Sequence, residues 1–481
     1  MNPRAVARLA APLLALVVVT LLAPVGLALH DGDALGVFAY GVATAGCGLL
    51  AALLRWFGRG TDDSIHRKDA IGVVVLVWLA MSIFGALPFV LDGSVPTFAA
   101  AIFEAASGFT TSGGSVIPNV EALTRASNLW RCEMHLIGGM GIVVLFVAVF
   151  PQLGVGAKQL FKVEVPGPSS EGLRPRIKQT ALALWWIYGA LMLLCTLLYW
   201  LGGMPIFDAV CHAMSTLGTG GFSTKAASIG HYQSAFIDWV TIAFMFVAGC
   251  NFGLYYMALR GRWRDLTSNP ELRFYLAVNL AVTLLIAWAI WDRHPDVGES
   301  LRYASFQTLA VTSTTGYMTE DFDAYPDICR FVLFLCMFMG GCAGSTAGGL
   351  KAVRVLLLLK AIARELRAAT SPNVVESIKL GRAAIPAQVT SAVLVFFAVY
   401  LAIFALGSLV LVALGLDLIS ATSGTIACLS SVGPGLGSIG PSRNFADVPA
   451  LGQLVLSACM IAGRLEVFVL LSVFTRDLWR R

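Results

Sequence analysis

Long apolar runs constrain this chain more than any other feature of its sequence. Residues 70–89, 181–201 and 389–414 are each long enough to cross a bilayer, which takes about 20 apolar residues in a helix. Of the 481 residues, 57% are hydrophobic and 13% are charged, whereas soluble domains carry about 25% charged residues. The sequence therefore predicts an all-α polytopic membrane protein.

The first two apolar runs, 10–29 and 34–54, lie close together. A cleaved signal peptide has a shorter apolar core and a small-residue cleavage site. We therefore expect residues 1–60 to form an uncleaved transmembrane hairpin.

Lysines and arginines gather in clusters that are separated by pairs of apolar runs. Because positive residues stay in the cytoplasm during insertion, this pattern predicts that both termini are cytoplasmic. The clusters are not interleaved with aromatic residues as nucleic-acid binding requires, so we expect no nucleic-acid partner. They comprise Arg4/Arg8, Arg55/Arg59/Arg67/Lys68, Lys158/Lys162/Arg174/Arg176/Lys178, Arg260/Arg262/Arg264/Arg273, the basic residues from Lys351 to Arg382, and Arg476/Arg480/Arg481.

After the hairpin, one pattern recurs four times: an apolar helix, a short half-apolar stretch, a Gly/Ser/Thr loop and a second apolar helix. The loops read FTTSGG, TLGTGG, STTGYM and SSVGPG, and the first glycine after a Ser, Thr or Val in each is Gly113, Gly220, Gly316 and Gly433. A spacing of roughly 100 residues predicts four copies of one unit. We expect pseudo-symmetric units at 61–170, 171–268, 269–375 and 376–481, arranged around a central pore.

The stretches before the loops, 96–107, 205–215, 303–312 and 418–428, are too short to cross the bilayer. Each is interpreted as a re-entrant pore helix that stops halfway. Non-helical backbone at membrane depth is tolerated only where it is buried in protein or lines a water-filled path. The loops are therefore expected to face the pore.

The loop chemistry indicates a selectivity filter for a monovalent cation. Backbone carbonyls replace a hydration shell in such filters, and glycine supplies the positive φ that their geometry needs. No loop carries a charge, whereas divalent ions usually require a carboxylate. A single loop of this kind is usually a plain turn, but four at matched positions favour a filter. The candidate K+-binding residues are Thr110, Thr111, Ser112, Gly113; Leu217, Gly218, Thr219, Gly220; Ser313, Thr314, Thr315, Gly316; and Ser430, Ser431, Val432, Gly433.

The third unit is interrupted by GGCAGSTAGG, residues 340–349. Each glycine costs a helix about 1 kcal/mol relative to alanine. The alternatives are a tolerated kink or a tight helix-packing face, but we favour a flexible intramembrane gating loop below the filter. The candidate gate residues are Gly340, Gly341, Gly344, Ser345, Thr346, Gly348 and Gly349, together with Arg464.

Arg464 lies within the apolar run 451–473, where a charge is a functional hypothesis by default. We expect it at the pore beneath the filter; the alternative is a structural role with backbone carbonyls. Glu466, two residues on, should have a different partner, because such residues do not face each other on a helix. Lys351 is expected to be a cytoplasmic anchor.

Acidic residues follow the third loop: Glu320, Asp321 and Asp323. They either concentrate cations at the outer mouth or form a solvated loop, and the sequence leaves both interpretations open.

Several motifs resemble the membrane subunit of the Trk-type bacterial potassium uptake systems, in the superfamily that includes Ktr and plant HKT transporters. They are residues 66–89, 130–145 (WRCEMHLIGGMGIVVL), 212–224 (HAMSTLGTGGFST), 340–354, 427–437 and 462–468. The N-terminal hairpin resembles the Trk branch. The resemblance implies a homodimer in the bacterial inner membrane with one pore per subunit and a cytoplasmic ring of nucleotide-binding regulatory subunits. In HKT relatives a serine at the first filter glycine accompanies sodium transport, so Gly113 favours potassium.

Two other functions are alternatives to a gated, channel-like pathway. A symporter that couples potassium to protons or sodium usually needs buried carboxylates, for which Glu104, Glu133 and Glu466 are the candidates. An intramembrane enzyme is disfavoured, because the sequence shows no catalytic dyad, aspartyl pair or metal motif. The ten cysteines form no CxxC pair and are expected to be buried hydrophobes, and GLGSIG (435–440) lacks the strand and helix of a dinucleotide site. We therefore expect no cofactor, with K+ present only as the transported ion.

Overall fold

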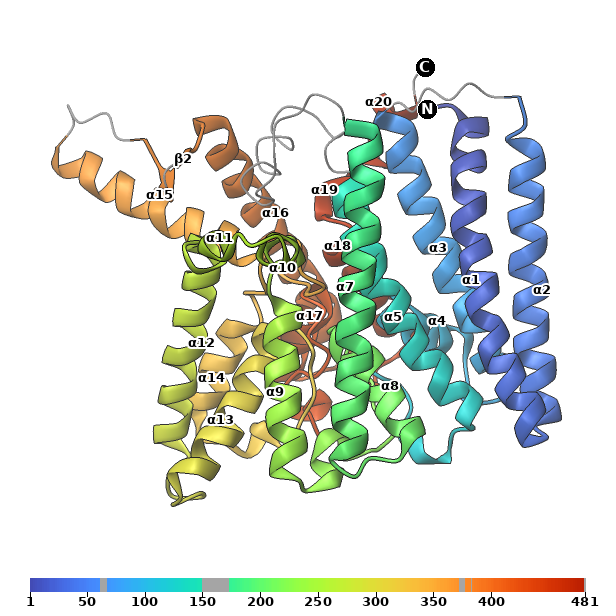
Figure 1. The fold of residues 1–481 in the computed structure, drawn as a ribbon, viewed down its shortest axis with the longest axis horizontal. Coiled ribbons are helices and arrows are strands. Elements are labelled where there is room, and N and C mark those ends of the chain that lie inside the picture. The colour runs from blue at the N-terminus through green and yellow to red at the C-terminus, as the bar shows by residue number, and fades with distance from the viewer. Residues whose placement is uncertain (61–66, 149–172, 372–376, 382, 480–481) are drawn as a thin grey trace.

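The computed structural model describes residues 1–60, 67–148, 173–371, 377–381 and 383–479, and helices dominate it (Figure 1). The prediction of an all-α membrane protein is confirmed, apart from one short antiparallel hairpin of β1 (Lys379–Leu380) and β2 (Ala383–Ala384). Five residues of the predicted basic clusters lie outside the described residues: Lys158, Lys162, Arg382, Arg480 and Arg481.

The two N-terminal helices, α1 (Pro3–Asp31) and α2 (Ala34–Phe57), form the predicted hairpin at one side of the molecule (Figure 1). The turn between them follows from local chemistry. Gly32 ends α1 in the left-handed region with φ of 72°, and the Asp33 side chain accepts a hydrogen bond from the amide of Gly36 to begin α2. The first residue lies beside the last described helix, because the amino group of Met1 donates to the carbonyl of Leu478 at 3.3 Å.

Four helix–short helix–helix units follow. The first has α3 (Arg67–Leu91), α4 (Phe98–Phe109) and α5 (Arg125–Ala148); the second has α7 (Leu173–Leu201), α8 (Ile206–Leu217), α9 (Ala235–Gly249) and α10 (Phe252–Leu259). The third has α12 (Pro270–Ala289), α13 (Val297–Thr312), α14 (Asp327–Cys336) and α15 (Ala352–Thr370); the fourth has α16 (Ala387–Ala413), α17 (Leu418–Leu429), α18 (Ala450–Arg464) and α19 (Val467–Ser472). Short connecting helices are η1 (Val120–Ala122), η3 (Ser228–Tyr232), α11 (Trp263–Thr267), η4 (Phe322–Ala324), η5 (Gly437–Ile439) and α20 (Arg476–Trp479).

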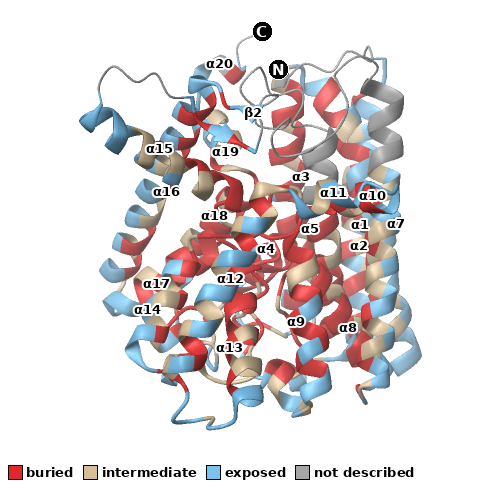
Figure 2. Ribbon diagram, turned by 60° about the vertical axis from the view of Figure 1, so that its left-hand side comes forward, coloured by how far each residue is buried: buried red, intermediate tan, exposed pale blue. Residues whose placement is uncertain are grey.

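The short second helices α4, α8, α13 and α17 are close to the predicted re-entrant segments. Helices α4, α13 and α17 are capped at their N-termini by a side chain that accepts a hydrogen bond from a backbone amide of the first turn. The capping residues are Thr97, Asp296 and Asp417, respectively. Their buried C-terminal halves enter the protein interior, where Figure 2 shows the buried residues concentrated.

The units are arranged in a cycle around one axis. Helix α5 contacts α8, α9 contacts α13, α15 contacts α16, and α18 contacts α4. Each unit therefore touches the next in chain order, and the fourth closes on the first.

Six of the described helices are long and apolar enough to cross a membrane: α1, α2, α3, α7, α12 and α16. The pair α9 and α10 also passes this test, but it is bent by 93°. That break was not predicted. It occurs where Asn251 caps α10 by accepting a hydrogen bond from the amide of Gly253.

Candidate functional site

The four Gly/Ser/Thr loops share one backbone conformation. A Ser or Thr in each has a positive φ of 53° to 59°, and a glycine two residues later has a φ of 72° to 96°. Positive φ is uncommon outside glycine and is worth attention for a β-branched residue. The matched residues are Thr111, Thr219, Thr314 and Ser431, followed by Gly113, Gly221, Gly316 and Gly433. We call this second set the ring glycines.

This pattern corrects the predicted alignment of the second loop. Gly221, not Gly220, has the positive φ that matches Gly113. Leu217, which the sequence assigned to the filter, is the last residue of α8. The four equivalent segments are therefore loop 1 (110–113), loop 2 (218–221), loop 3 (313–316) and loop 4 (430–433).

The ring glycines pack the four loops against one another in a closed cycle. A Cβ atom built on any of them would lie 2.0 to 2.6 Å from a carbonyl oxygen of the next loop, which is too close for any side chain. The pairs are Gly113 with Gly220, Gly221 with Thr315, Gly316 with Val432, and Gly433 with Ser112. Loop 4 thus returns to loop 1.

Neutral oxygens dominate this ring. The side chains of Thr110, Ser112, Thr315 and Ser430 are all buried, and the four short helices end at the ring, directing the partial negative charge of their C-termini toward it. Among the described residues, the buried hydroxyls of Thr111, Ser112 and Ser431 have no hydrogen-bond partner. Buried polar atoms in native proteins nearly always have a partner.

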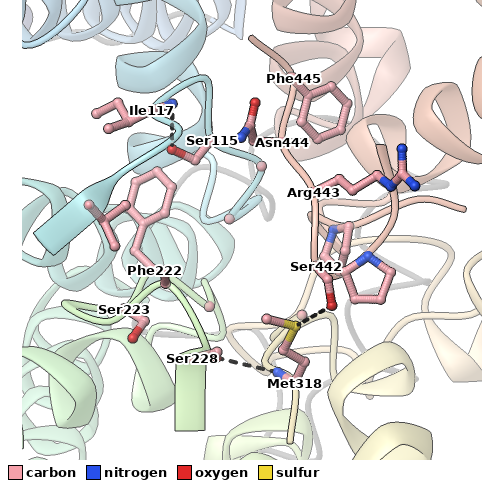
Figure 3. Close-up of a pocket in the computed structure, with 18 of the residues that line it drawn as sticks. Ser115, Ile117, Phe222, Ser223, Ser228, Met318, Ser442, Arg443, Asn444 and Phe445 are labelled. Carbon is pink, nitrogen blue, oxygen red and sulfur yellow. Dashed lines mark hydrogen bonds between the residues drawn. The ribbon is translucent and has the colours of Figure 1, made fainter. Parts of the chain in front are cut away.

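A cavity of about 160 Å³ lies on one side of the ring, and Figure 3 shows the residues around it. The segments that follow all four loops line it, including Ser115 from the first, Phe222 and Ser223 from the second, Met318 from the third and Phe445 from the fourth.

The 340–349 segment is a non-helical loop packed against the ring. The amide of Gly348 donates to the Thr314 hydroxyl at 2.8 Å, and a Cβ on Gly348 would lie 2.4 Å from the carbonyl oxygen of Ser430. Gly341 and Gly344 instead face the break between α9 and α10, near Gly249 and Asn251.

The other predicted gate residues complete the same loop. Gly340 and Gly349 pack against each other, and the amide of Gly340 donates to the carbonyl of Leu350 at 2.9 Å. The Ser345 hydroxyl donates to the carbonyl of Cys342 within the loop at 2.5 Å, and the Thr346 hydroxyl donates to that of Ala248 at 3.2 Å.

Arg464 is buried at the end of α18 and joins this loop to the first unit. Its guanidinium donates to the carbonyl of Thr346 at 2.7 Å and to that of Gly138 at 3.0 Å. Arg464 therefore lies next to the glycine-rich loop, and its partners are backbone carbonyls, as the alternative interpretation expected. Glu466 has a different partner, as predicted: its carboxylate lies 2.7 Å from Arg354.

Lys351 is not a cytoplasmic anchor. Its side chain is buried, and its ammonium donates to the carbonyl of Ala347 in the 340–349 loop. The sequence placed it after the loop, where a lysine next to a basic helix resembles a topology signal.

The acidic residues after loop 3 hold protein groups. Asp323 pairs with Arg330 at 3.0 Å and accepts the amide of Gly437 from the fourth unit at 3.1 Å, while Glu320 lies 2.8 Å from His294. The Asp321 side chain caps η4. These contacts favour a structural role over either interpretation of the sequence.

Two buried carboxylates have roles that the sequence did not reveal. Glu271, at the start of α12, accepts the amide of Ala343 at 2.7 Å and that of Val353 at 3.1 Å, so it joins the 340–349 loop to the first turn of α15. Glu104 pairs with Arg131 at 2.8 Å. The sequence signal for both residues is a carboxylate next to or within an apolar run. This signal indicates a buried charge, but it does not identify the group that the carboxylate contacts.

A multi-pass membrane fold with four re-entrant loops in a closed ring defines a membrane transport protein. The family model of TrkH, described as a cation transport protein, matches residues 44–478. The chain therefore belongs to the TrkH family, whose members are transporters and not enzymes.

The relatives and the solved structure agree with this assignment. The Trk system potassium uptake protein TrkH of Salmonella typhimurium is 39% identical over 440 residues, with 90% of each chain covered. The TrkG protein of Escherichia coli is 33% identical, with 86% of each chain covered. The crystal structure of the potassium transporter TrkH from Vibrio parahaemolyticus superposes with a TM-score of 0.91 at 35% identity, covering all of both chains.

Proposed function

We propose that this protein carries K+ into the cell through a gated, channel-like pore in which loops 1 to 4 form the selectivity filter. The observation that carries the proposal is the closed ring of uncharged loops, each held by a ring glycine against the carbonyl of the next. Neutral oxygens at fixed spacing suit a dehydrated monovalent cation. The unpartnered hydroxyls of Thr111, Ser112 and Ser431 add oxygens that an ion or its water can engage.

The 340–349 loop is the proposed gate. Its amide at Gly348 bonds to loop 3 and its backbone packs on loop 4, so in this conformation it occupies space next to the ring. Arg464 places a buried guanidinium on the same loop. A fixed positive charge beside the path opposes cation passage, which supports a closed state.

The organisation of the system is part of the proposal. The units span 1–60, 61–170, 171–268, 269–375 and 376–481, and both termini are cytoplasmic in a bacterial inner membrane, surrounded by lipid. Relatives are named as Trk system proteins, which supports assembly with other components; we propose a homodimer with a cytoplasmic regulatory ring.

Uptake of K+ or its congener Rb+ by cells that lack other uptake routes tests the proposal, with and without a cytoplasmic regulatory partner. We expect saturable uptake that the partner increases. Absence of uptake despite confirmed membrane expression with the partner would contradict the proposal.

Symport remains the second candidate because of one residue. Arg131 and Arg354 neutralise Glu104 and Glu466, whereas buried Glu133 has a carboxylate oxygen, Oε2, with no hydrogen-bond partner among the described residues. In proteoliposomes with an imposed pH gradient, symport predicts proton-driven K+ accumulation that Glu133→Gln abolishes. A channel-like path predicts equilibration with the K+ gradient alone in both proteins.

A further inference from the structure

One ion pair is far more deeply buried than the others in the described part of the chain. Arg131 of α5 and Glu104 of α4 lie 2.8 Å apart, with their side chains 2% and 0% exposed. Such a pair is weak evidence for stability, because desolvation offsets the attraction between the charges. Its position at the ring suggests another role.

Glu104 fixes the segment that follows loop 1. Its carboxylate accepts the amide of Val116 at 2.9 Å and the Ser115 hydroxyl at 3.0 Å. The ion pair is therefore anchored to the segment that leaves the first ring glycine.

Arg131 extends from this anchor to the second unit. Its guanidinium donates to the Ser115 hydroxyl at 3.2 Å and to the carbonyl of Ser223 at 3.1 Å, and it lies 4.1 Å from the centre of the Phe222 ring. Ser115 and Ser223 each lie two residues after a ring glycine, so the planar fork of one arginine contacts equivalent positions of loops 1 and 2. Figure 3 shows Ser115, Phe222 and Ser223 on the same side of the cavity.

The contacts at two other junctions beside the ring are made by neutral donors. Tyr317 donates from its hydroxyl to the carbonyl of His212 at 3.1 Å, joining the second and third units. The amide of Phe445 donates to the carbonyl of Ser115 at 2.8 Å, joining the fourth unit to the first. Among these three junctions, that of loops 1 and 2 is the one with a charged donor that contacts both segments.

We propose that Arg131, oriented by Glu104, is a positioning residue that sets the spacing of loops 1 and 2 and thereby the discrimination of the ring between K+ and Na+. The inference rests on the proposed function. A lysine at this position keeps the charge, but its compact ammonium lacks the planar fork that reaches Glu104, Ser115 and Ser223 together. The spacing of the two loops would then relax, and the difference in binding between the two ions would fall.

The test measures K+ uptake with Na+ as competitor in proteoliposomes that contain the full-length wild type or Arg131→Lys. We expect the K+ preference of Arg131→Lys to fall about fivefold. This ratio corresponds to the loss of about one hydrogen bond's net contribution to the difference in binding between the two ions. A variant that is merely less well folded would have a lower maximal rate at an unchanged ion preference. Arg302→Lys is the matched control, because Arg302 is another partly buried arginine whose ion-pair partners in the described residues are Asp238 of the neighbouring unit, at 3.4 Å, and Glu299.

Ser115→Ala provides a milder variant if Arg131→Lys fails to assemble. It removes the hydroxyl that accepts from Arg131 and donates to Glu104, but leaves the ion pair of these two residues and the bond from Arg131 to the Ser223 carbonyl, so we expect a loss of K+ preference of about twofold. An unchanged preference in whichever of these two variants assembles would overturn the inference. Lack of K+ uptake by the wild type is a separate result, which would instead contradict the proposed function.

Discussion

The ring loops and the 340–349 loop are both glycine-rich, buried and non-helical, yet they are held in opposite ways. Each ring loop repeats the same two positive-φ residues and the same glycine-to-carbonyl packing, so every loop supports the next. The 340–349 loop has no such repeat: it is held by hydrogen bonds to unrelated groups, including Thr314, Arg464 and Glu271, and by close packing of Gly348 on the carbonyl of Ser430.

This difference indicates which region can move. Displacing one ring loop removes contacts on both sides, whereas each anchor of the 340–349 loop is a separate interaction whose net contribution is about 1 kcal/mol. A rigid ring next to a weakly anchored loop is the arrangement that a filter with an adjacent gate requires.

Breaking the ring should have the largest effect. Gly221→Ala places a Cβ 2.0 Å from the carbonyl oxygen of Thr315 at a φ of 79°, so the junction of loops 2 and 3 cannot form. We expect K+ uptake to fall at least about 100-fold, because the steric clash and the strained backbone of an alanine at positive φ together cost several kcal/mol. Gly189→Ala is the control, because nothing lies within 4 Å of its new Cβ. Uptake by Gly221→Ala at the wild-type rate would contradict the packing.

Removing the 340–349 loop tests the other half of the comparison. Deletion of residues 341–348 should raise K+ flux about tenfold, because the segment beside the ring is gone while the ring glycines remain. Flux in proteoliposomes that contain equal amounts of the wild-type and the deleted protein measures this. Unchanged or lower flux from a well-expressed deletion would count against a gate.

A second change to the ring has the same steric fault as Gly221→Ala and should also alter the ion selectivity of the uptake that remains. In Gly113→Ser, the new side chain meets the carbonyl oxygen of Gly220 at 2.0 Å, which disturbs the junction of loops 1 and 2. We expect discrimination against Na+ to fall about tenfold, equivalent to about 1.4 kcal/mol of differential binding. Competition uptake reports the ratio independently of expression. If the mutant keeps its ion preference, Gly113 does not set it.

The smallest predicted effect concerns one anchor of the 340–349 loop. Glu271→Ala removes the acceptor shared by the amides of Ala343 and Val353, so basal flux should rise about threefold. Glu271→Gln retains an acceptor oxygen and should lie closer to the wild type. Glu365→Ala, on the exposed part of α15, serves as the control. A Glu271→Ala protein with wild-type basal flux would show that this anchor does not hold the loop.

Much of the architecture was predictable because membrane constraints act on local sequence. The hairpin, the four short helices and the irregular 340–349 segment follow from run length and from glycine content. The alignment of loop 2 was wrong because Gly220 and Gly221 are consecutive, and composition does not say which of two glycines takes the positive φ.

The partners of buried charges could not be predicted. Arg131 and Glu104 are 27 residues apart in the chain, and Glu271 reaches a loop more than 70 residues away. Each of these contacts lies within one unit but joins helices or loops that are distant in the chain, so it forms only when the unit packs and no local pattern identifies it. The positive φ of Thr111 and its equivalents was missed because these residues end their own short helices: the amide of Ser112 donates back to the carbonyl of Ser107 at 2.8 Å. Glycine is the usual residue in that left-handed position, and a Thr or Ser there gives no sequence signal.

The position of the ion tests the central claim most directly. A structure of the protein solved with Rb+ or Tl+ would show whether the four loops bind the cation. The account predicts anomalous density on the axis enclosed by loops 1 to 4, surrounded only by neutral oxygens. Density confined to a site away from that axis, in protein that transports the same ion, would contradict it.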